Sequence, residues 1–203
     1  MDTKTVVELR AMTGAGMMDC KKALDESNGD LAKAAETLRK KGLAKAGTRA
    51  ARATKEGLVH AYIHPNGRLG VLVEVQCETD FVARTEQFQE FVHDIAMQVA
   101  ASAPLYVAPE DVPGEVVAKE REIAMEEFAG SSKPKDVIDR IAEGKIAKYY
   151  EETCLLNQRF IKDEDVTIGD LLKAKISTTG ENMKIVRFSR FNLEAAPATC
   201  CEE

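Results

Sequence analysis

The sequence predicts an α+β protein, in which a small helical part precedes an antiparallel sheet with helices packed on it. Three observations support this fold class. Apolar residues recur at helical spacing through roughly the first forty residues. Two runs of β-forming residues, joined by a turn signal, follow at 57–77. After several helical segments, a last β-rich run returns at 183–191. A hairpin, helices and a returning strand are together typical of this architecture.

The first fifty-five residues predict three short helices. The first spans Thr5–Met12 and is followed by two glycines, which favour its end. The second carries its apolar residues at spacings of three and four on one face: Met17, Cys20 and Leu24. Asp30, after a turn signal, is placed to cap the third helix, which we expect Gly42 to end.

The charge of the chain changes sign near residue 56, which indicates two modules. Residues 1–56 hold twelve Lys or Arg and eight Asp or Glu, although the 203-residue chain has a formal net charge of −6. Seven basic residues occur without an intervening acid: Arg39, Lys40, Lys41, Lys45, Arg49, Arg52 and Lys55. Interleaved alanines favour a solvated connecting helix. The alternative, a nucleic-acid-binding adaptor, is disfavoured because no aromatic residues interleave the charges. We therefore expect no nucleic-acid partner.

The residues after this point predict the sheet. Residues 57–64 and 68–77 are the two β-rich runs, and Pro65-Asn66-Gly67 joins them as a hairpin turn. In the second run, alternate apolar residues share one face: Val71, Val73, Val75 and Cys77. The apolar residues then return to helical spacing: Phe88, Phe91, Val92, Ile95 and Val99.

Further helices and a final strand complete the prediction. Pro113 lies near the first turn of a helix that we expect to run through Phe128, and Pro134 opens the next. Thr167 is placed to cap a short helix. The run at 183–191 predicts a strand that, at a sheet edge, could pair with a copy of itself.

These patterns divide the chain into three parts. Residues 1–55 form a three-helix N-terminal domain with a basic linker helix, 56–193 an α+β core domain, and 194–203 a flexible tail without a pattern. No run approaches the roughly 18 apolar residues that span a membrane, and the N-terminus does not have the pattern of a secretory signal. Five cysteines without CxxC spacing suit a reducing compartment. We therefore expect a cytoplasmic protein with no membrane partner.

Motifs for catalysis are scarce. Phosphate-binding, dinucleotide-binding, zinc-protease and hydrolase motifs are all missing from the sequence. His60 and His64 lie on one predicted strand about 13 Å apart, which is too far to share a metal ion. For Cys20, a buried helical thiol is favoured over the nucleophile of a thiol-dependent enzyme. We therefore predict no catalytic residue, no metal and no cofactor.

Thr13–Leu24 suggests a surface for a protein partner. Its adjacent methionines, Met17 and Met18, cannot both face one helical core, so at least one is expected to be exposed. An exposed methionine is a pliable contact for a partner. The alternative is that one packs inward and the other lies at the rim of the core.

A second segment begins where the second predicted strand ends. Thr79 or Asp80 can cap a helix there, and capping alone would explain both residues. Phe81 stands at the start of that helix, next to an acid. Its ring either packs on the first turn or faces solvent, where it would be free to contact a partner.

At these two segments the chain resembles the bacterial translation elongation factor Ts family. The stretches TGAGMMDCKKAL at Thr13–Leu24 and TDFVA at Thr79–Ala83 are similar to its two signature regions, and agreement extends from about Lys4 to Leu193. The resemblance implies a three-helix N-terminal domain like the ubiquitin-associated fold, followed by an α+β core. Longer members carry a second copy of the core. This chain has one, like the short members, so the resemblance implies a homodimer formed through 56–193.

The resemblance also implies a function, that of a guanine-nucleotide exchange factor for elongation factor Tu. Such a factor binds both the GDP-bound and the nucleotide-free partner and performs no chemical step, so it is not an enzyme. Two sets of residues are implied to contact the partner: Thr79, Asp80, Phe81 and Val82, which dislocate its Mg²⁺ so that GDP leaves, and Met17, Met18 and Asp19 of the N-terminal domain.

Overall fold

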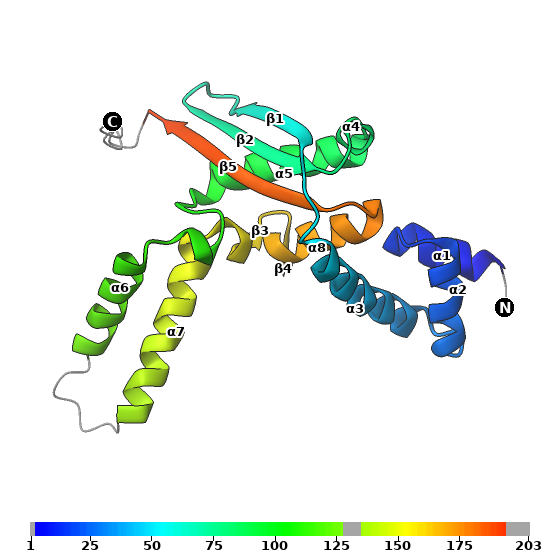
Figure 1. Ribbon diagram of the computed structural model, residues 1–203, viewed down its shortest axis with the longest axis horizontal. Coiled ribbons are helices and arrows are strands. Elements are labelled where there is room, and N and C mark those ends of the chain that lie inside the picture. The colour runs from blue at the N-terminus through cyan, green and yellow to red at the C-terminus, as the bar shows by residue number, and fades with distance from the viewer. Residues whose placement is uncertain (1–2, 128–134, 194–203) are drawn as a thin grey trace. The chain divides into compact units, whose positions relative to one another are not determined.

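The computed structural model describes residues 3–127 and 135–193, with side chains at all of these except 43–46. Helices accompany a small antiparallel sheet (Figure 1), so the α+β class is confirmed. Two compact units divide the chain: one comprises Met1–Leu58, Val75–Gln89 and Asp170–Lys184, and the other Val59–Glu74, Glu90–Gly169 and Ile185–Glu203. The predicted boundary at residue 55 stays a prediction, and the predicted tail lies outside the described residues.

Three helices open the chain as predicted: α1 (Thr3–Thr13), α2 (Met17–Glu26) and α3 (Leu31–Arg49). They share a small core of buried residues: Val6, Leu9, Cys20, Ala23, Leu24, Ala34 and Leu38. The turn between α2 and α3 places Asn28 at a φ of 52°, and Gly29 N–H donates to Leu24 O at 2.9 Å, which closes the end of α2. Asp30 caps α3 by accepting from Lys33 N–H at 3.1 Å, as predicted.

The expectation that Gly42 ends the third helix is wrong, because α3 continues to Arg49. One interior glycine costs only about 1 kcal/mol relative to alanine, and the alanine-rich sequence around it offsets that cost. Gly42 has a packing role instead. A Cβ at this position would lie 2.6 Å from Ser177 Oγ and 3.2 Å from Ser177 Cβ, so a larger residue here would force the Ser177 side chain to shift.

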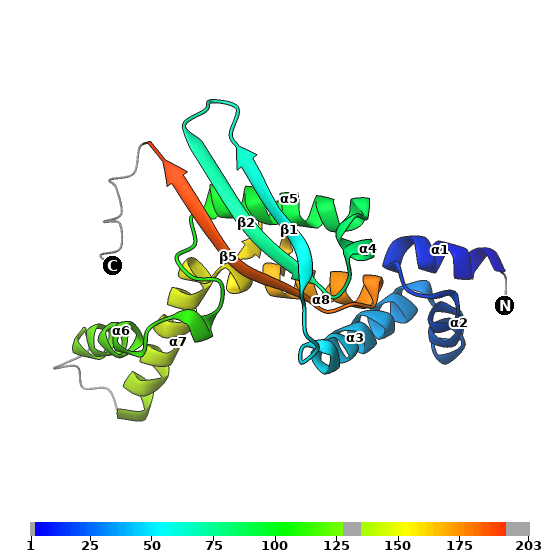
Figure 2. The ribbon, with the colours of Figure 1, turned by 45° about the horizontal axis from the view of Figure 1, so that its top comes forward.

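The main sheet has the order β1-β2-β5, with β1 (Glu56–Ile63), β2 (Leu69–Cys77) and β5 (Met183–Asn192) side by side in Figure 2. The predicted hairpin is present, since His64 N–H donates to Leu69 O at 2.9 Å across its turn. Leu193 N–H donates to Arg68 O at 3.0 Å, so the end of β5 lies beside the start of β2 and the two strands are antiparallel. The predicted strand is present as β5, and it lies at an edge of this sheet.

One face of β2 is buried, and α5 (Glu86–Ser102) supplies buried residues beside it. The alternating positions predicted for the strand are all buried: Val71, Val73, Val75 and Cys77. So are the helical positions predicted for α5: Phe88, Phe91, Val92, Ile95 and Val99. The spacing of apolar residues, which changes from every second residue in the strand to about every 3.6 residues in the helix, therefore predicted these buried positions correctly.

The remaining elements are α4 (Asp80–Ala83), α6 (Gly114–Glu126), α7 (Lys135–Thr153), β3 (Arg159–Phe160), β4 (Asp163–Thr167) and α8 (Ile168–Thr179), with 3₁₀ turns at Pro109–Asp111 and Leu155–Asn157. The end of the helix predicted through Phe128, and its successor's Pro134, lie outside the described residues. α8 begins directly after Thr167, where a helix start was predicted. Across 3–127 and 135–193, no helix combines the length and the apolar character that crossing a membrane requires.

The antiparallel β3–β4 pair was not predicted. Its strands are short, and β4 has the acidic sequence DEDVT, which lacks an apolar alternation. A buried side chain fixes this hairpin from outside it. Gln98 donates to Arg159 O at 3.0 Å and accepts from Ile161 N–H at 2.9 Å. Because this contact joins residues more than sixty positions apart, local patterns cannot reveal it.

Candidate partner-binding site

The turn that follows β2 holds the second predicted segment. Thr79 precedes α4 in an extended conformation, with φ −129° and ψ 154°, and its hydroxyl accepts from Val82 N–H at 3.4 Å. This is the geometry of a helix N-cap, so the capping prediction is confirmed. Asp80 is the first residue of α4, and Ala83, the last, is buried. Thr79, Asp80, Phe81 and Val82 are thus brought together on one short capped helix.

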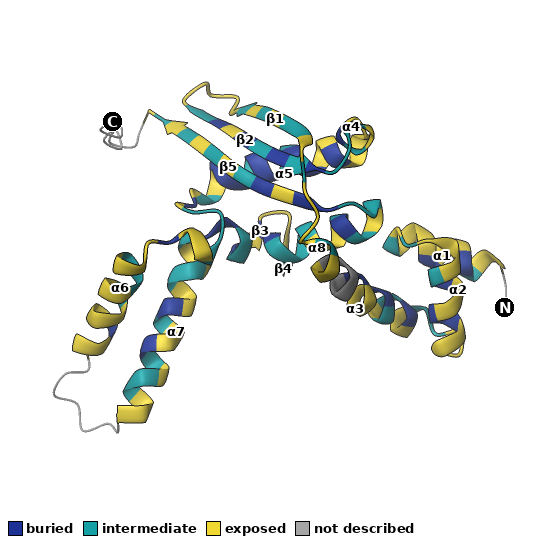
Figure 3. Ribbon diagram, viewed as in Figure 1, coloured by how far each residue is buried: buried dark blue, intermediate teal, exposed yellow. Residues whose placement is uncertain are grey.

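Phe81 projects from this helix with 79% of its surface exposed. The alternative in which the ring packs on the first turn is therefore wrong. Soluble proteins bury most phenylalanine side chains, so a ring this exposed is available to a partner. Within α4, Phe81 is exposed, Asp80 and Val82 are partly buried and Ala83 is buried, whereas α5, which follows it, carries a buried stripe (Figure 3).

Asp80 forms an ion pair with Arg84, whose Nη2 lies 2.9 Å from its Oδ2. The two residues are one helical turn apart, and the side chain of Arg84 is 79% exposed and that of Asp80 45%. Exposed pairs of this kind contribute about 0–1 kcal/mol. The carboxylate of Asp80 is therefore held loosely, and a stronger cationic or N–H partner can displace Arg84 at small cost.

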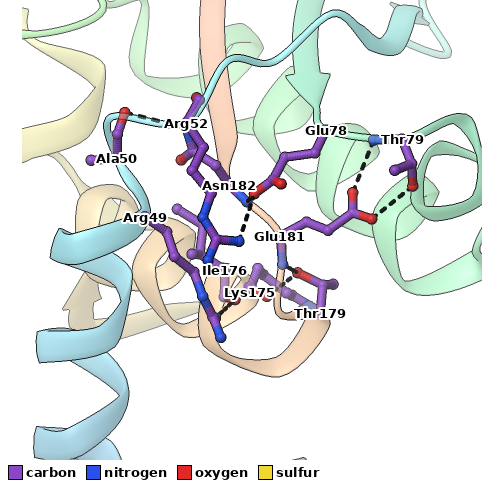
Figure 4. Close-up of polar contacts among 10 residues, drawn as sticks. All are labelled: Arg49, Ala50, Arg52, Glu78, Thr79, Lys175, Ile176, Thr179, Glu181 and Asn182. Atoms are coloured by element: carbon purple, nitrogen blue, oxygen red, sulfur yellow. Dashed lines mark hydrogen bonds and ion pairs between the residues drawn. The ribbon is translucent and has the colours of Figure 1, made fainter.

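Glu181, from the turn between α8 and β5, holds the capping residue (Figure 4). Its Oε2 accepts from Thr79 N–H at 3.0 Å, and its Oε1 accepts from the Thr79 hydroxyl at 2.7 Å. Hydrogen bonds to a charged acceptor are stronger than those between neutral groups. The end of β2 is thereby fixed to a turn more than a hundred residues away in the sequence.

Glu78 and Asn182 form a second set of hydrogen bonds near the pair between Glu181 and Thr79 (Figure 4). Glu78 Oε1 accepts from Asn182 N–H at 2.6 Å and from Arg52 Nη1 at 3.4 Å. The buried side chain of Asn182 donates to Ala50 O at 3.3 Å and to Arg52 O at 2.8 Å. The Asn182 N–H bond, followed by the charge of Arg52, lowers the pKa of Glu78, so its carboxylate stays ionised at neutral pH.

The pKa of the Cys77 thiol is affected by burial and by the negative charge at this turn. Its buried thiol donates to Thr79 O at 3.1 Å. Burial, followed by the negative charge of Glu181, raises the pKa of Cys77 to about 11. The thiol is therefore protonated at neutral pH and is a structural donor, because a nucleophilic cysteine requires a lowered pKa.

The predicted N-terminal contact residues lie on α2. Met17 is 39% exposed and Met18 67% exposed, so both methionines reach the surface, whereas Asp19 is partly buried. The prediction that at least one methionine is exposed is confirmed. These residues and the Phe81 turn belong to different elements, and nothing in the local sequence relates them.

The basic stretch at 39–55 uses several of its side chains within the protein. Arg49 Nη1 donates to Ile176 O at 3.0 Å, and Arg52 bonds Glu78. Lys40 and Lys41 form ion pairs with Glu36 and Glu26 at 2.7 and 2.6 Å. These contacts agree with the connecting helix that was favoured for this stretch over an open binding surface for nucleic acid.

The three histidines lie near one another on β1, on α5 and at the hairpin turn. His60 Nε2 lies 3.1 Å from His93 Nδ1, and Tyr62 Oη lies 3.0 Å from His64 Nδ1. The Tyr62 and His93 rings meet edge-on, with centroids 5.7 Å apart. Within the described part of the chain, no three His, Cys, Asp or Glu side chains gather as metal ligands.

Stability should depend on pH through His60. Burial, followed by the nearby His93, lowers the pKa of His60 below its ordinary value of 6.5. The unfolded chain therefore binds a proton there more readily than the folded chain, so the unfolding free energy falls as pH decreases through about 6.5. We expect His60→Gln, measured by urea denaturation at pH 7.5 and 5.0, to lose less stability on acidification than the unmodified chain. Equal losses in both proteins would contradict this role.

Sequence reasoning missed the residues that support the turn. Glu181 and Asn182 lie in the stretch that resembles the family, and Glu78 in the segment that begins at Cys77, but no role was predicted for any of them because their roles depend on contacts across the fold. A weak signal did exist, since a glutamate stands in each of the two short links that meet here, Cys77-Glu78-Thr79 and Gly180-Glu181-Asn182. Cys20 was placed correctly, because its thiol lies within the N-terminal core.

Comparison with known proteins agrees with these features. The sequence model of the family "Elongation factor TS" matches residues 21–195. The chain is 58% identical over 188 residues to elongation factor Ts of Moorella thermoacetica, covering 93% of both chains. It is 56% identical over 191 residues to that of Carboxydothermus hydrogenoformans, covering 94% of this chain and 88% of the relative. The corresponding protein of Thermosipho melanesiensis is 53% identical over 193 residues, with 95% and 98% covered. The chain therefore belongs to the elongation factor Ts family of translation elongation factors.

Proposed function

We propose that this chain is a cytoplasmic guanine-nucleotide exchange factor for elongation factor Tu. It binds the GDP-bound partner, displaces Mg²⁺ and releases GDP, and GTP then binds the nucleotide-free partner. Family membership supports the identity of the partner. The observation that carries the mechanism is the exposed ring of Phe81, presented on a capped turn that Glu181 holds by two hydrogen bonds.

The energetics of exchange require more than this ring. To loosen a nucleotide about 10⁴-fold, the factor must bind the empty partner about 5.5 kcal/mol more tightly than the occupied one. Burial of one phenylalanine supplies roughly 1.5–3 kcal/mol. The remainder must come from weaker binding of Mg²⁺ and phosphate by the partner and from a second docking surface. Thr79, Asp80 and Val82 contribute to the first effect.

The second surface is the N-terminal domain, which we take to have the ubiquitin-associated fold. Met17, Met18 and Asp19 contact the partner's nucleotide-binding domain on another face. The exposure of both methionines supports this assignment, because flexible thioether side chains adapt to a partner surface. The domain core is small, so its contribution is to dock the factor.

Exchange of this kind needs no chemical step and no cofactor of the factor's own. By linkage, bound nucleotide weakens the factor's affinity by the same ratio as the factor weakens the nucleotide's. The factor therefore speeds equilibration without selecting GDP or GTP. We propose neither a membrane nor a nucleic-acid partner, since Arg49 and Arg52 are engaged within the protein.

The test is the release of a fluorescent GDP analogue from purified elongation factor Tu after rapid mixing with excess GDP. We expect the chain to accelerate release in substoichiometric amounts. Removal of Mg²⁺ by a chelator should accelerate release without the factor and should reduce the further acceleration that the factor adds. A release rate independent of the factor's concentration would refute the proposal.

We further propose that the chain is a homodimer and that the outer face of its main sheet forms the interface. Apolar side chains on this face are exposed: Val59, Ile63, Leu72 and Phe191. Glu74 and Arg187, paired at 2.7 Å, lie among them. An isologous dimer buries such a self-complementary patch on both copies, and exposed apolar patches of this kind mark interaction sites.

Leu72→Asp should dissociate the dimer. Two-fold symmetry places the new carboxylate in the interface twice, where desolvation is costly. We expect the dissociation constant to rise at least about 100-fold, equivalent to about 2.8 kcal/mol, as measured by analytical ultracentrifugation over a concentration series. Leu105→Asp makes the same change at another exposed leucine and should leave the mass unchanged. Equal dimerisation of both variants would exclude this face.

A further inference from the structure

The carboxylate of Glu181 does not stabilise the turn that carries it, because its hydrogen bonds go to another segment of the chain. Glu181 uses both oxygens on one residue, Thr79, accepting from its N–H at 3.0 Å and from its hydroxyl at 2.7 Å. Figure 4 shows the side chain extending from its turn toward the start of α4. Thr79 is the capping residue of α4, so Glu181 contacts the residue that determines where this helix begins.

The two bonds to Glu181 determine how Thr79 caps the helix. A threonine hydroxyl has one proton to donate and two lone pairs to accept with. Because Glu181 takes the proton, only the lone pairs remain available toward Val82, whose N–H lies 3.4 Å away. Without Glu181, the hydroxyl could rotate to donate elsewhere, and the cap would lose its fixed direction.

Helix α4 depends on this cap more than an ordinary helix does. It spans four residues, Asp80–Ala83, which is too short to be stable by itself. Phe81 is 79% exposed, so packing of the ring within the protein does not determine its position. The backbone of α4 therefore determines where the ring points, and the cap determines the backbone.

Glu181 is itself held in place. Its N–H donates to Thr179 Oγ1 at 3.4 Å. The next residue, Asn182, is buried and is tied to Ala50, Arg52 and Glu78 by the bonds described above. The carboxylate thus reaches Thr79 from an ordered turn, as a preorganised site requires. The raised pKa of the neighbouring Cys77, to which the charge of Glu181 contributes, agrees with this placement.

We propose that Glu181 is a positioning residue for nucleotide exchange, which holds Thr79 so that α4 presents Phe81 in the orientation that opens the partner's Mg²⁺ site. This inference rests on the proposed function. It assigns Glu181 no contact with the partner, since its effect passes through Thr79. It also predicts that loss of Glu181 impairs the opening of the nucleotide site more than it impairs docking.

The kinetic test uses Glu181→Gln, which keeps the shape of the side chain but replaces one acceptor oxygen by a donor group that faces the donors of Thr79. The rate of GDP release is measured against the concentration of the folded factor, up to saturation. We expect the maximum rate to fall at least fivefold, with less than a twofold change in the half-saturating concentration. Glu164→Gln makes the same change at an exposed position of β4 and should change neither quantity.

A second readout does not depend on exchange. The chain contains no tryptophan, so Phe81→Trp introduces a unique fluorophore at the tip of α4. We expect its fluorescence anisotropy to fall when Glu181→Gln is added and to stay constant when Glu164→Gln is added. Thr79→Val, which removes the hydroxyl, should lower the anisotropy as Glu181→Gln does, and the double variant should show no further decrease.

The outcomes separate this inference from the proposed function. If Phe81→Ala abolishes exchange but folded Glu181→Gln keeps both the maximum rate and the anisotropy, the positioning role is overturned and the proposed function stands. If Phe81→Ala exchanges normally, the ring has no part in exchange and the positioning role of Glu181 is overturned with it, whereas a release rate independent of the concentration of the unmodified chain would refute the proposed function itself. A proportional loss of rate and of folded protein in Glu181→Gln, with the anisotropy of the folded fraction unchanged, would show a merely structural role and also overturn the inference.

Discussion

Replacement of Phe81 by alanine is expected to slow factor-stimulated GDP release from elongation factor Tu at least tenfold while leaving the chain folded. The ring is 79% exposed in the free protein, so nearly all of its burial energy is available on docking. A tenfold loss corresponds to about 1.4 kcal/mol, which is at the lower end of the roughly 1.5–3 kcal/mol gained by burying a phenylalanine. The measurement is the maximum release rate at saturating factor.

Stability supplies the control for this variant. Exposed side chains away from special features change stability by no more than about 0.5 kcal/mol, so the urea midpoint of Phe81→Ala should match that of the unmodified chain. Leu105→Ala, which shortens another exposed apolar side chain, should retain full exchange. A folded Phe81→Ala protein with an unchanged release rate would remove the ring from the mechanism.

The fold class and most elements could be predicted because their signals are local. The alternation that ends at Cys77 and the helical spacing that begins at Phe88 each depend on residues within a few positions of one another, and both identified buried faces. Asp30 was likewise identified as a cap from its residue type at a helix start, and the second cap was narrowed to Thr79 or Asp80, of which the structure has Thr79. Local chemistry determines these features, so tertiary context had little to override.

The errors arose where distant contacts decide the structure. Gly42 favours a helix end by local preference, yet it lies inside α3, where it packs against the side chain of Ser177 from α8. The β3–β4 pair depends on Gln98, which lies far away in the sequence. The candidate site divides in the same way. Sequence patterns located the ring of Phe81 and its capped turn but left its exposure open, and they did not identify Glu181, which holds the cap.

Phe88→Ala should have the opposite effect from Phe81→Ala. Phe88 lies at the start of α5, is fully buried, and its N–H donates to Thr85 Oγ1 at 3.3 Å. Truncation of a buried phenylalanine costs about 3–5 kcal/mol, through reduced burial and the cavity that remains. Since domains are stable by only about 5–15 kcal/mol, the variant should be marginal at 37 °C and show a clearly lower urea midpoint.

The comparison between these two variants separates exchange from folding. At a low temperature, where Phe88→Ala is folded, its release rate per folded molecule should approach that of the unmodified chain, because the cap on Thr79 and the ring of Phe81 remain. A stability loss below about 1 kcal/mol would contradict the assignment of Phe88 to the core. The two substitutions, seven positions apart, would then have separate effects. Phe81→Ala would lower the exchange rate and leave the stability unchanged, whereas Phe88→Ala would lower the stability and leave the exchange rate per folded molecule unchanged. That pattern is expected only if Phe81 is exposed for a partner rather than as a by-product of folding.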